Sequence, residues 1–229
     1  MNDRQLEMTN LAKEIAACTK CQLHLSRKKS VPGEGNIQTK ILLIGEGPGM
    51  NENETGRPFV GQAGNFLNEL LATAGVKREE VFITNVVKCR PPANRDPMPE
   101  ELSACAGYLD RQIALINPLI IVTLGRFSMA RYFPFKRISA IHGQGHWING
   151  KMIVPMFHPA AALHQPNLRS SILHDFALLP EYLKDAMDRL NPETAVEDNP
   201  EKGPSAQPAN PPAQEEKKTD NTPQQLSFF

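Results

Sequence analysis

The sequence predicts an α/β fold built on a largely parallel sheet. Four short apolar runs, each bounded by turn-forming residues, are typical of buried strands and cover residues 41–44, 81–87, 119–124 and 153–157. Stretches with helical spacing of apolar residues lie between and around them. Because strands that alternate with helices form parallel crossover units, this order indicates a sheet whose strands mostly run the same way.

The helices are expected from apolar spacing and from the residues that begin and end helices. Asn65 is a candidate N-cap for the second helix, which should stop near Gly75. Pro99, followed by two glutamates, is a favourable start for the third helix. The predicted helices cover residues 4–17, 65–75, 99–117 and 170–190.

Composition divides the 229 residues into a domain, 1–190, and a tail, 191–229. The net charge is zero, yet residues 1–190 carry 22 Lys and Arg against 18 Asp and Glu, and the tail carries 3 against 7. A mildly basic body permits nucleic-acid binding without proving it. The tail holds seven prolines and few apolar residues, so we expect it to be disordered.

The totals also exclude some classes of protein. No apolar run reaches the roughly 18 residues that span a bilayer, and the first residues lack the apolar region of a signal peptide. We therefore expect a cytoplasmic protein with no membrane contact. Separately, we expect a monomer. Disulfides are rare in that compartment, so the four cysteines need another explanation.

The cysteines are Cys18 and Cys21, spaced as C-x-x-C, and Cys89 and Cys105, separated by fifteen residues. The C-x-x-C spacing lets two thiolates reach one metal centre. Four unrelated buried thiols would explain Cys105 well and the C-x-x-C pair poorly. A zinc ion held by all four thiolates is a better explanation than four unrelated thiols. Spacing alone does not choose between zinc and an iron–sulfur cluster.

The run Ile41–Ile44 enters the loop Gly45-Glu46-Gly47-Pro48-Gly49. Ligands of open α/β sheets bind just beyond the carboxyl ends of such strands, so this loop is a candidate site. A dinucleotide-binding loop is excluded because Met50 stands where the third glycine of G-x-G-x-x-G belongs. The P-loop lysine and hydroxyl are also absent, which makes a nucleotide-binding enzyme a distant possibility.

Four motifs follow one another in the chain: Gly45-Glu46-Gly47-Pro48-Gly49, Gly56-Arg57-Pro58-Phe59-Val60-Gly61, the run from Thr84 to Pro92, and His158-Pro159-Ala160-Ala161. Together with the four cysteines around them, they resemble the family 4 (iron–sulfur) uracil-DNA glycosylases over residues 8–188. The resemblance implies a three-layer α/β/α fold for the catalytic domain, residues 1–190. It also implies a 4Fe–4S cluster held by Cys18, Cys21, Cys89 and Cys105, with structural zinc as the alternative.

Such an enzyme flips uracil out of DNA and hydrolyses its N-glycosidic bond in base excision repair, which leaves an abasic site. The Asn85 amide matches uracil O4 and N3–H, and cytosine presents the opposite pattern. Phe59 suits a stacking platform, and His158 would donate to uracil O2 as charge builds on the leaving base. The backbone at Glu46 and Gly47 would line the same pocket. Ordinary structural roles remain the alternatives for Phe59, Asn85 and His158.

One position departs from the most efficient uracil glycosylases. They carry a water-orienting aspartate where this chain has Gly47, and family 4 members generally have a small residue there. The catalytic water would then be held by Glu46 or by the backbone. Basic loop residues are candidates for contacts to the DNA backbone: Arg57, Lys88, Arg90, Lys136, Arg137 and Arg169.

The last residues of the tail, Gln225, Leu226, Ser227, Phe228 and Phe229, resemble the peptide by which bacterial repair proteins dock on the sliding clamp. This resemblance also suggests a bacterial origin. The competing hypothesis for the whole chain is a non-catalytic DNA-binding module recruited by the clamp, with its metal centre purely structural.

Overall fold

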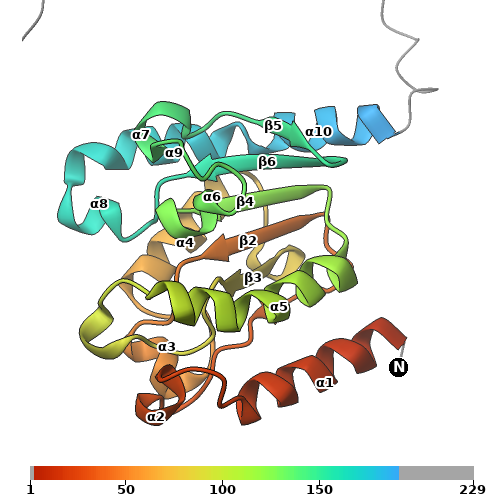
Figure 1. The fold of residues 1–229 in the computed structure, drawn as a ribbon. Coiled ribbons are helices and arrows are strands. Elements are labelled where there is room, and N and C mark those ends of the chain that lie inside the picture. The colour runs from red at the N-terminus through yellow and green to blue at the C-terminus, as the bar shows by residue number, and fades with distance from the viewer. Residues whose placement is uncertain (1–2, 191–229) are drawn as a thin grey trace, which may run out of the picture. The chain divides into compact units, whose positions relative to one another are not determined.

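The structure is a computed structural model that describes residues 3–190 (Figure 1). The tail 191–229, and with it the predicted clamp-binding peptide, lies outside the described residues. Within residues 3–190, no helix is both long and apolar enough to cross a membrane.

A six-stranded sheet forms the centre of the domain, in the order β1-β3-β2-β4-β6-β5. The four inner strands are parallel, and the short strands at the two edges are antiparallel to their neighbours. The largely parallel sheet is thus confirmed. The strands are β1 (Glu34–Gly35), β2 (Ile41–Gly45), β3 (Phe82–Asn85), β4 (Ile120–Leu124), β5 (His146–Ile148) and β6 (Lys151–Met156).

The helices are α1 (Asp3–Ala17), α2 (Leu23–Ser26), α3 (Met50–Thr55), α4 (Gln62–Thr73), α5 (Pro99–Ile116), α6 (Arg126–Ala130), α7 (Ile138–Ile141), α8 (Ala161–His164), α9 (Arg169–Ala177) and α10 (Leu179–Leu190). Three short 3-10 helices add η1 (Arg78–Glu80), η2 (Pro92–Asn94) and η3 (Pro166–Leu168).

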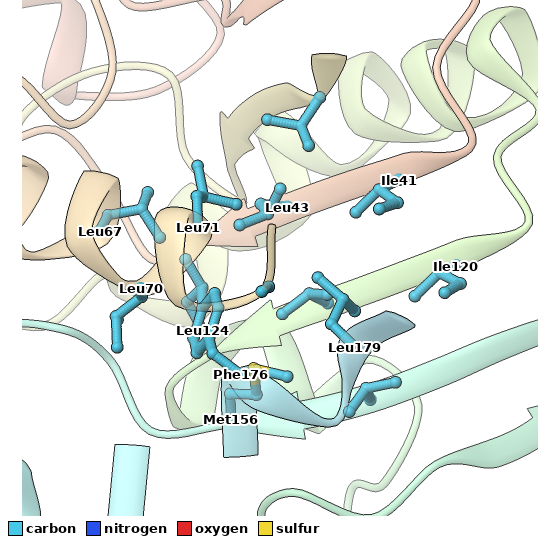
Figure 2. Close-up of a cluster of buried hydrophobic side chains, with 14 of the residues drawn as sticks. Ile41, Leu43, Leu67, Leu70, Leu71, Ile120, Leu124, Met156, Phe176 and Leu179 are labelled. Atoms are coloured by element: carbon cyan, nitrogen blue, oxygen red, sulfur yellow. The ribbon is translucent and has the colours of Figure 1, made fainter. Parts of the chain in front are cut away.

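Strand β2 shows why the domain has three layers. Successive side chains of a strand point to opposite faces, and all of β2 is buried. Ile41 and Leu43 join the core that α4, α9 and α10 cover, which Figure 2 shows from close by. Leu42 and Ile44 join the core under α1 and α5 on the other face. The predicted α/β/α layering is therefore confirmed.

Two helix boundaries differ from the prediction. The helix expected from Ser170 to Leu190 is divided into α9 and α10, because Pro180 has no N–H with which to continue the first helix. Helix α4 begins at Gln62, one turn before the predicted cap, and Asn65 instead donates its backbone N–H to the Gly61 carbonyl at 3.0 Å. A glycine rather than an asparagine therefore occupies the N-cap.

Several short elements were not predicted. Helix α3 lies in the polar stretch expected to be loop, and the edge strands β1 and β5 are too short to give a readable pattern. The inner strand β3 ends at Asn85, two residues before the end of the apolar run, because Val86 and Val87 already turn towards the β2 loop.

Candidate functional site

A pocket of about 450 Å³ opens at the carboxyl ends of β2, β3 and β6. The five residues predicted to bind the base, Glu46, Gly47, Phe59, Asn85 and His158, all line it. Four of them end or follow strands of the parallel sheet, and Phe59 lies in the loop between α3 and α4. The remaining lining residues are Pro48, Gly49, Glu52, Ala63, Pro91, Asn94, Arg95, Ala160, Ala161 and His164.

Asn85 is the most deeply buried of the predicted base-binding residues that line this pocket. It is the last residue of β3, pairs with Gly45 across the parallel ladder and is 1% exposed. Its side-chain oxygen Oδ1 is buried without a hydrogen-bond partner in residues 3–190. An unpaired buried acceptor costs about 1–3 kcal/mol, and a bound molecule that supplied a donor to this oxygen would offset that cost.

Gly45 makes the close approach of the pocket residues possible. A Cβ added to Gly45 would lie 2.4 Å from Oδ1 of Asn85 and 2.8 Å from Cζ of Phe59. Any side chain at this position would therefore displace both groups. The glycine at the end of β2 thus serves packing within the pocket.

Phe59 and His158 form an aromatic pair at one wall. Their ring centroids are 5.5 Å apart and the ring planes differ by 27°, a stacked arrangement. Phe59 belongs both to the core cluster and to the pocket lining, so the two roles considered for it are compatible.

The hydrogen bonding of His158 defines its tautomer. Nδ1 accepts the backbone N–H of Ala160 at 3.1 Å, which leaves Nε2 to carry the proton of the neutral ring. Burial lowers the pKa of His158 to about 4, against a smaller raising effect of the Glu52 carboxylate. The ring is therefore a neutral donor near pH 7.

Glu46 and Gly47 follow β2, and their loop is fastened to the chain after β3. Val87 donates its backbone N–H to the Glu46 carbonyl at 3.1 Å. Burial, with Asp96 nearby, raises the pKa of the Glu46 carboxyl, although Arg126 opposes this. A Cβ on Gly47 would lie 2.8 Å from Cγ2 of Val87, so a larger residue there would require Val87 to move.

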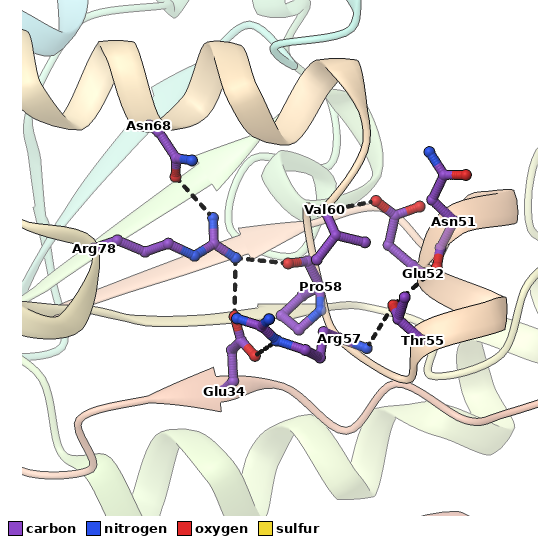
Figure 3. A network of polar contacts seen from close by, with 9 residues as sticks. All are labelled: Glu34, Asn51, Glu52, Thr55, Arg57, Pro58, Val60, Asn68 and Arg78. Carbon is purple, nitrogen blue, oxygen red and sulfur yellow. Dashed lines mark hydrogen bonds and ion pairs between the residues drawn. The ribbon is translucent and has the colours of Figure 1, made fainter.

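Glu52 is a pocket residue that the sequence interpretation missed. Its carboxylate accepts backbone N–H groups from Gly49 at 3.0 Å, Val60 at 2.9 Å and Gly61 at 3.3 Å (Figure 3 draws the Val60 contact). A glutamate three residues after a turn glycine has the spacing of a capping box, and this spacing was the available signal. Its contacts to residues 60 and 61 connect segments that no local pattern relates.

The loop after Cys89 closes the other side of the pocket. Ala93 and Asn94 have φ angles of +53° and +55°, a region that L-residues rarely adopt. Arg90 donates to the Asn94 side chain at 2.8 Å. Arg95 forms a bidentate pair with the buried Glu101 and thereby lowers the pKa of that carboxyl. This loop, including Asn94, was also not predicted as part of the site.

The four cysteines lie around a second, apolar cavity. Cys18 and Cys21 come from the turn between α1 and α2, Cys89 follows β3, and Cys105 belongs to α5. None of them forms a disulfide. Within residues 3–190, no three thiol, imidazole or carboxyl groups are arranged to hold a single metal ion. The structure thus brings the four thiols to one cavity.

Hydrogen-bond donors already point at these sulfurs. Arg27 donates to Sγ of Cys89 and the backbone N–H of Lys88 donates to Sγ of Cys105, both at 3.3 Å. Burial raises the pKa of Cys105 to about 11, so a thiolate there requires a compensating positive charge. N–H donors to the sulfurs of the two buried cysteines fit a thiolate-ligated metal centre.

Lys88 was predicted to contact the DNA backbone, but its side chain lies inside the fold. It is 1% exposed, and Nζ donates to the Asn85 carbonyl, Thr84 Oγ1 and Gln112 Oε1 at 2.6–2.8 Å. Burial lowers its pKa to about 7. A lysine saturated inside the fold does not reach a phosphate, so this prediction was wrong.

The sequence comparisons agree with the geometry. Residues 32–186 match the family model described as the uracil DNA glycosylase superfamily. The chain is similar to the type-4 uracil-DNA glycosylase of Thermotoga maritima, with 44% identity over 80% of this chain and 98% of the relative. Proteins of the same description from Sulfurisphaera tokodaii and Archaeoglobus fulgidus are 45% and 43% identical, each over 76% of this chain and over 84% and 92% of the relative.

Proposed function

The chain belongs to the type-4 uracil-DNA glycosylase family, and from this premise we propose that it excises uracil from DNA in the pocket beyond β2, β3 and β6. It is a hydrolase that acts on the N-glycosyl bond, and its product is an abasic site. The observation that carries the assignment of the pocket is the buried Oδ1 of Asn85, an acceptor without a partner in residues 3–190.

Base recognition combines one amide with one aromatic face. Oδ1 of Asn85 would accept N3–H of the flipped uracil, and the amide nitrogen would donate to O4. Cytosine carries an unprotonated N3 and an amino group at these places, so it would face the amide with the opposite pattern. Phe59 would stack on the base, a contact worth about 1–3 kcal/mol per base in proteins that bind unpaired bases.

His158 would stabilise the departing base. Negative charge develops on uracil as the glycosidic bond breaks, and a fixed donor aimed at O2 is stronger in the transition state than in the ground state. Because Nδ1 accepts the Ala160 N–H, the proton on Nε2 is available for this contact. With its pKa lowered to about 4, the ring would act as a neutral hydrogen-bond donor.

We assign the catalytic water to Glu46. Gly47 provides no side chain, and Val87 occupies the space next to it. The carboxylate of Glu52 is already engaged by three backbone N–H groups. Glu46 therefore remains as the pocket carboxylate that can orient a water molecule towards the sugar carbon.

Cys18, Cys21, Cys89 and Cys105 would hold a 4Fe–4S cluster, with structural zinc as the rival. Their common cavity and the donors from Arg27 and the Lys88 backbone support this proposal. A bound cluster would supply iron–thiolate links and a centre able to exchange an electron. Those links would join the α1–α2 turn, the loop after β3 and helix α5.

The tail adds a proposal that rests on sequence alone. Leu226, Phe228 and Phe229 would serve as apolar anchors that dock on a sliding clamp. Removing residues 225–229 should leave excision from short oligonucleotides unchanged and weaken binding to the clamp. We also propose that the enzyme works in the cytoplasm.

A direct assay separates this function from non-catalytic DNA binding. A strand with one uracil is incubated with the protein, treated with alkali and compared with the same strand carrying thymine. The proposed function predicts a nick at the uracil position only. Binding of both strands without a nick would support the non-catalytic DNA-binding module instead.

A further inference from the structure

The backbone of Phe59 has an unusual conformation. Its φ is +51°, in the left-handed region where a residue with a Cβ costs about 1–2 kcal/mol. The side chain is 6% exposed and stacks on His158. A bulky residue persists in this region only where its surroundings hold it there.

The peptide groups on both sides of Phe59 are held by charged side chains. Arg78, in η1, donates from Nη2 to the Pro58 carbonyl at 2.7 Å. Glu52, in α3, accepts the Val60 N–H at 2.9 Å. Figure 3 shows both contacts, one to each side of this loop. Hydrogen bonds with an ionised partner are about twice as strong as neutral ones.

Both side chains are themselves anchored. Arg78 also donates to Oε1 of Glu34 and to the Asn68 side chain, each at 3.0 Å. Glu52 is fixed by the Gly49 and Gly61 N–H groups. The guanidinium and the carboxylate therefore offer rigid partners to the loop, with little side-chain freedom left to lose.

Helix α4 closes the third side of the loop. A Cβ on Gly64 would lie 1.9 Å from the Phe59 carbonyl oxygen, so the helix lies directly against this peptide group. This contact limits how the loop can move, but it contributes no hydrogen bond that selects the sign of φ. The hydrogen bonds to the peptide groups on both sides of Phe59 come instead from the two charged partners.

We propose that Glu52 and Arg78 are positioning residues that hold Phe59 in its left-handed conformation and so keep its ring where the flipped uracil stacks. This inference rests on the proposed stacking role of Phe59. Neither residue needs to touch the base, because each acts through a peptide group next to Phe59. We call the pair the Phe59 clamp.

A double-mutant cycle tests the clamp in the full-length enzyme. Glu52→Gln and Arg78→Met are each made in the wild-type chain and in a chain that also carries Phe59→Leu. Measurements are the single-turnover rate on a uracil-containing strand, the inhibition constant of free uracil, and the melting temperature. Glu54→Gln, on the same helix but paired with exposed Lys28, and Arg111→Met, paired with Glu14 at the α1–α5 side, are matched controls.

The clamp predicts coupled effects. Phe59→Leu should slow excision about tenfold or more, the range expected for losing one base–aromatic stack. Glu52→Gln and Arg78→Met should each slow it about 3- to 30-fold and weaken uracil inhibition. In the Phe59→Leu background, the same changes should alter the rate less than about twofold. The control variants should match the wild-type rate.

Three results would overturn the proposal. Equal losses with and without Phe59→Leu would show that the two residues act on the fold or on another group. A slow Phe59→Leu enzyme with unaffected clamp variants would remove the clamp and leave the stacking role intact. An unaffected Phe59→Leu enzyme would remove the stacking role itself. If Arg78→Met does not fold, Asn68→Ala removes one anchor of Arg78 at an exposed position and should slow excision by a smaller factor.

Discussion

Phe59 stacks on His158 with ring centroids 5.5 Å apart, although the two residues stand almost a hundred positions apart in the chain. The ring that would hold the base therefore contacts the ring that would stabilise its departure. Gly45 lies next to Phe59 and Asn85, so the end of β2 completes a compact set of pocket groups.

The first prediction concerns the charge of His158. Burial lowers its pKa to about 4, so the ring should stay neutral from pH 8 down to pH 5. An NMR titration of the histidine ring protons should show one residue that changes only near pH 4, and His158→Gln should remove that signal. Titration of His158 near its ordinary value of about 6.5 would contradict the neutral-donor mechanism.

The same shift predicts how stability depends on pH. Between pH 6.5 and 4 the unfolded chain binds a proton at His158 that the folded chain does not, so the free energy of unfolding falls as the pH is lowered through this window. His158→Gln should lose less stability than the wild type over that range. Parallel curves of urea midpoint against pH for the two proteins would argue against the shift.

The second prediction concerns the acid side of the pH–rate profile. His158 protonates only near pH 4. A loss of rate that already begins above pH 4 as the pH is lowered should therefore follow protonation of Glu46, whose pKa is raised by burial. Glu46→Gln should lower the rate at pH 7 and flatten this part of the profile. A Glu46→Gln enzyme with the wild-type rate and profile would exclude Glu46 as the group that orients water.

The third prediction concerns Gly45, with Gly107 as the control. Gly45→Ala places a Cβ 2.4 Å from Asn85 Oδ1, so it should slow excision about 100-fold and destabilise the protein by roughly 1–3 kcal/mol. Gly107→Ala is the matched control, because nothing lies within 4 Å of its added Cβ in helix α5. That change should keep the rate and add up to about 1 kcal/mol of stability. Equal activity of both variants would show that Gly45 is not required for the pocket.

The fourth prediction concerns the cysteine cavity. The purified protein should be brown and contain iron, and Cys105→Ser should lose the iron, the visible absorption and several degrees of melting temperature. Ser103→Ala, two residues away on the same helix, is the control and should keep its iron. Colourless wild-type protein with stoichiometric zinc would assign the cavity to the rival metal.

Much of the fold was predictable because strong local patterns coincide with it. The apolar runs at β2, β4 and β6 are buried along their length, and the helical spacing of α4 and α5 matches the faces they bury. In α1 the match is partial, because Leu11 and Ile15 are buried while Leu6 is exposed and Met8 is buried instead. Short elements such as α3 and β5 depend on tertiary contacts, so no periodicity identified them. Pro180 was visible in the sequence, and its helix-breaking effect was underestimated.

In the site, too, residues in recognisable motifs could be predicted, whereas residues placed by tertiary contacts could not. The motif residues Glu46, Phe59, Asn85 and His158 could be named before the structure, and all line one pocket. The residues that hold them could not. Arg78 reaches the Pro58 carbonyl from twenty positions away, a contact that only the folded chain creates. Lys88 was misjudged because sequence alone does not reveal that a charged residue is buried among three oxygen acceptors.

The most direct test of the account is the single-turnover rate of uracil release by Asn85→Ala and His158→Ala. With folding and DNA binding shown to be intact, the rate of the His158→Ala variant should be about 100-fold or more below that of the wild type, because a transition-state donor is removed. The rate of the Asn85→Ala variant should be about tenfold or more below that of the wild type, because the base loses its pairing partner. If both variants released uracil at the wild-type rate, the pocket beyond β2, β3 and β6 would not be the active site.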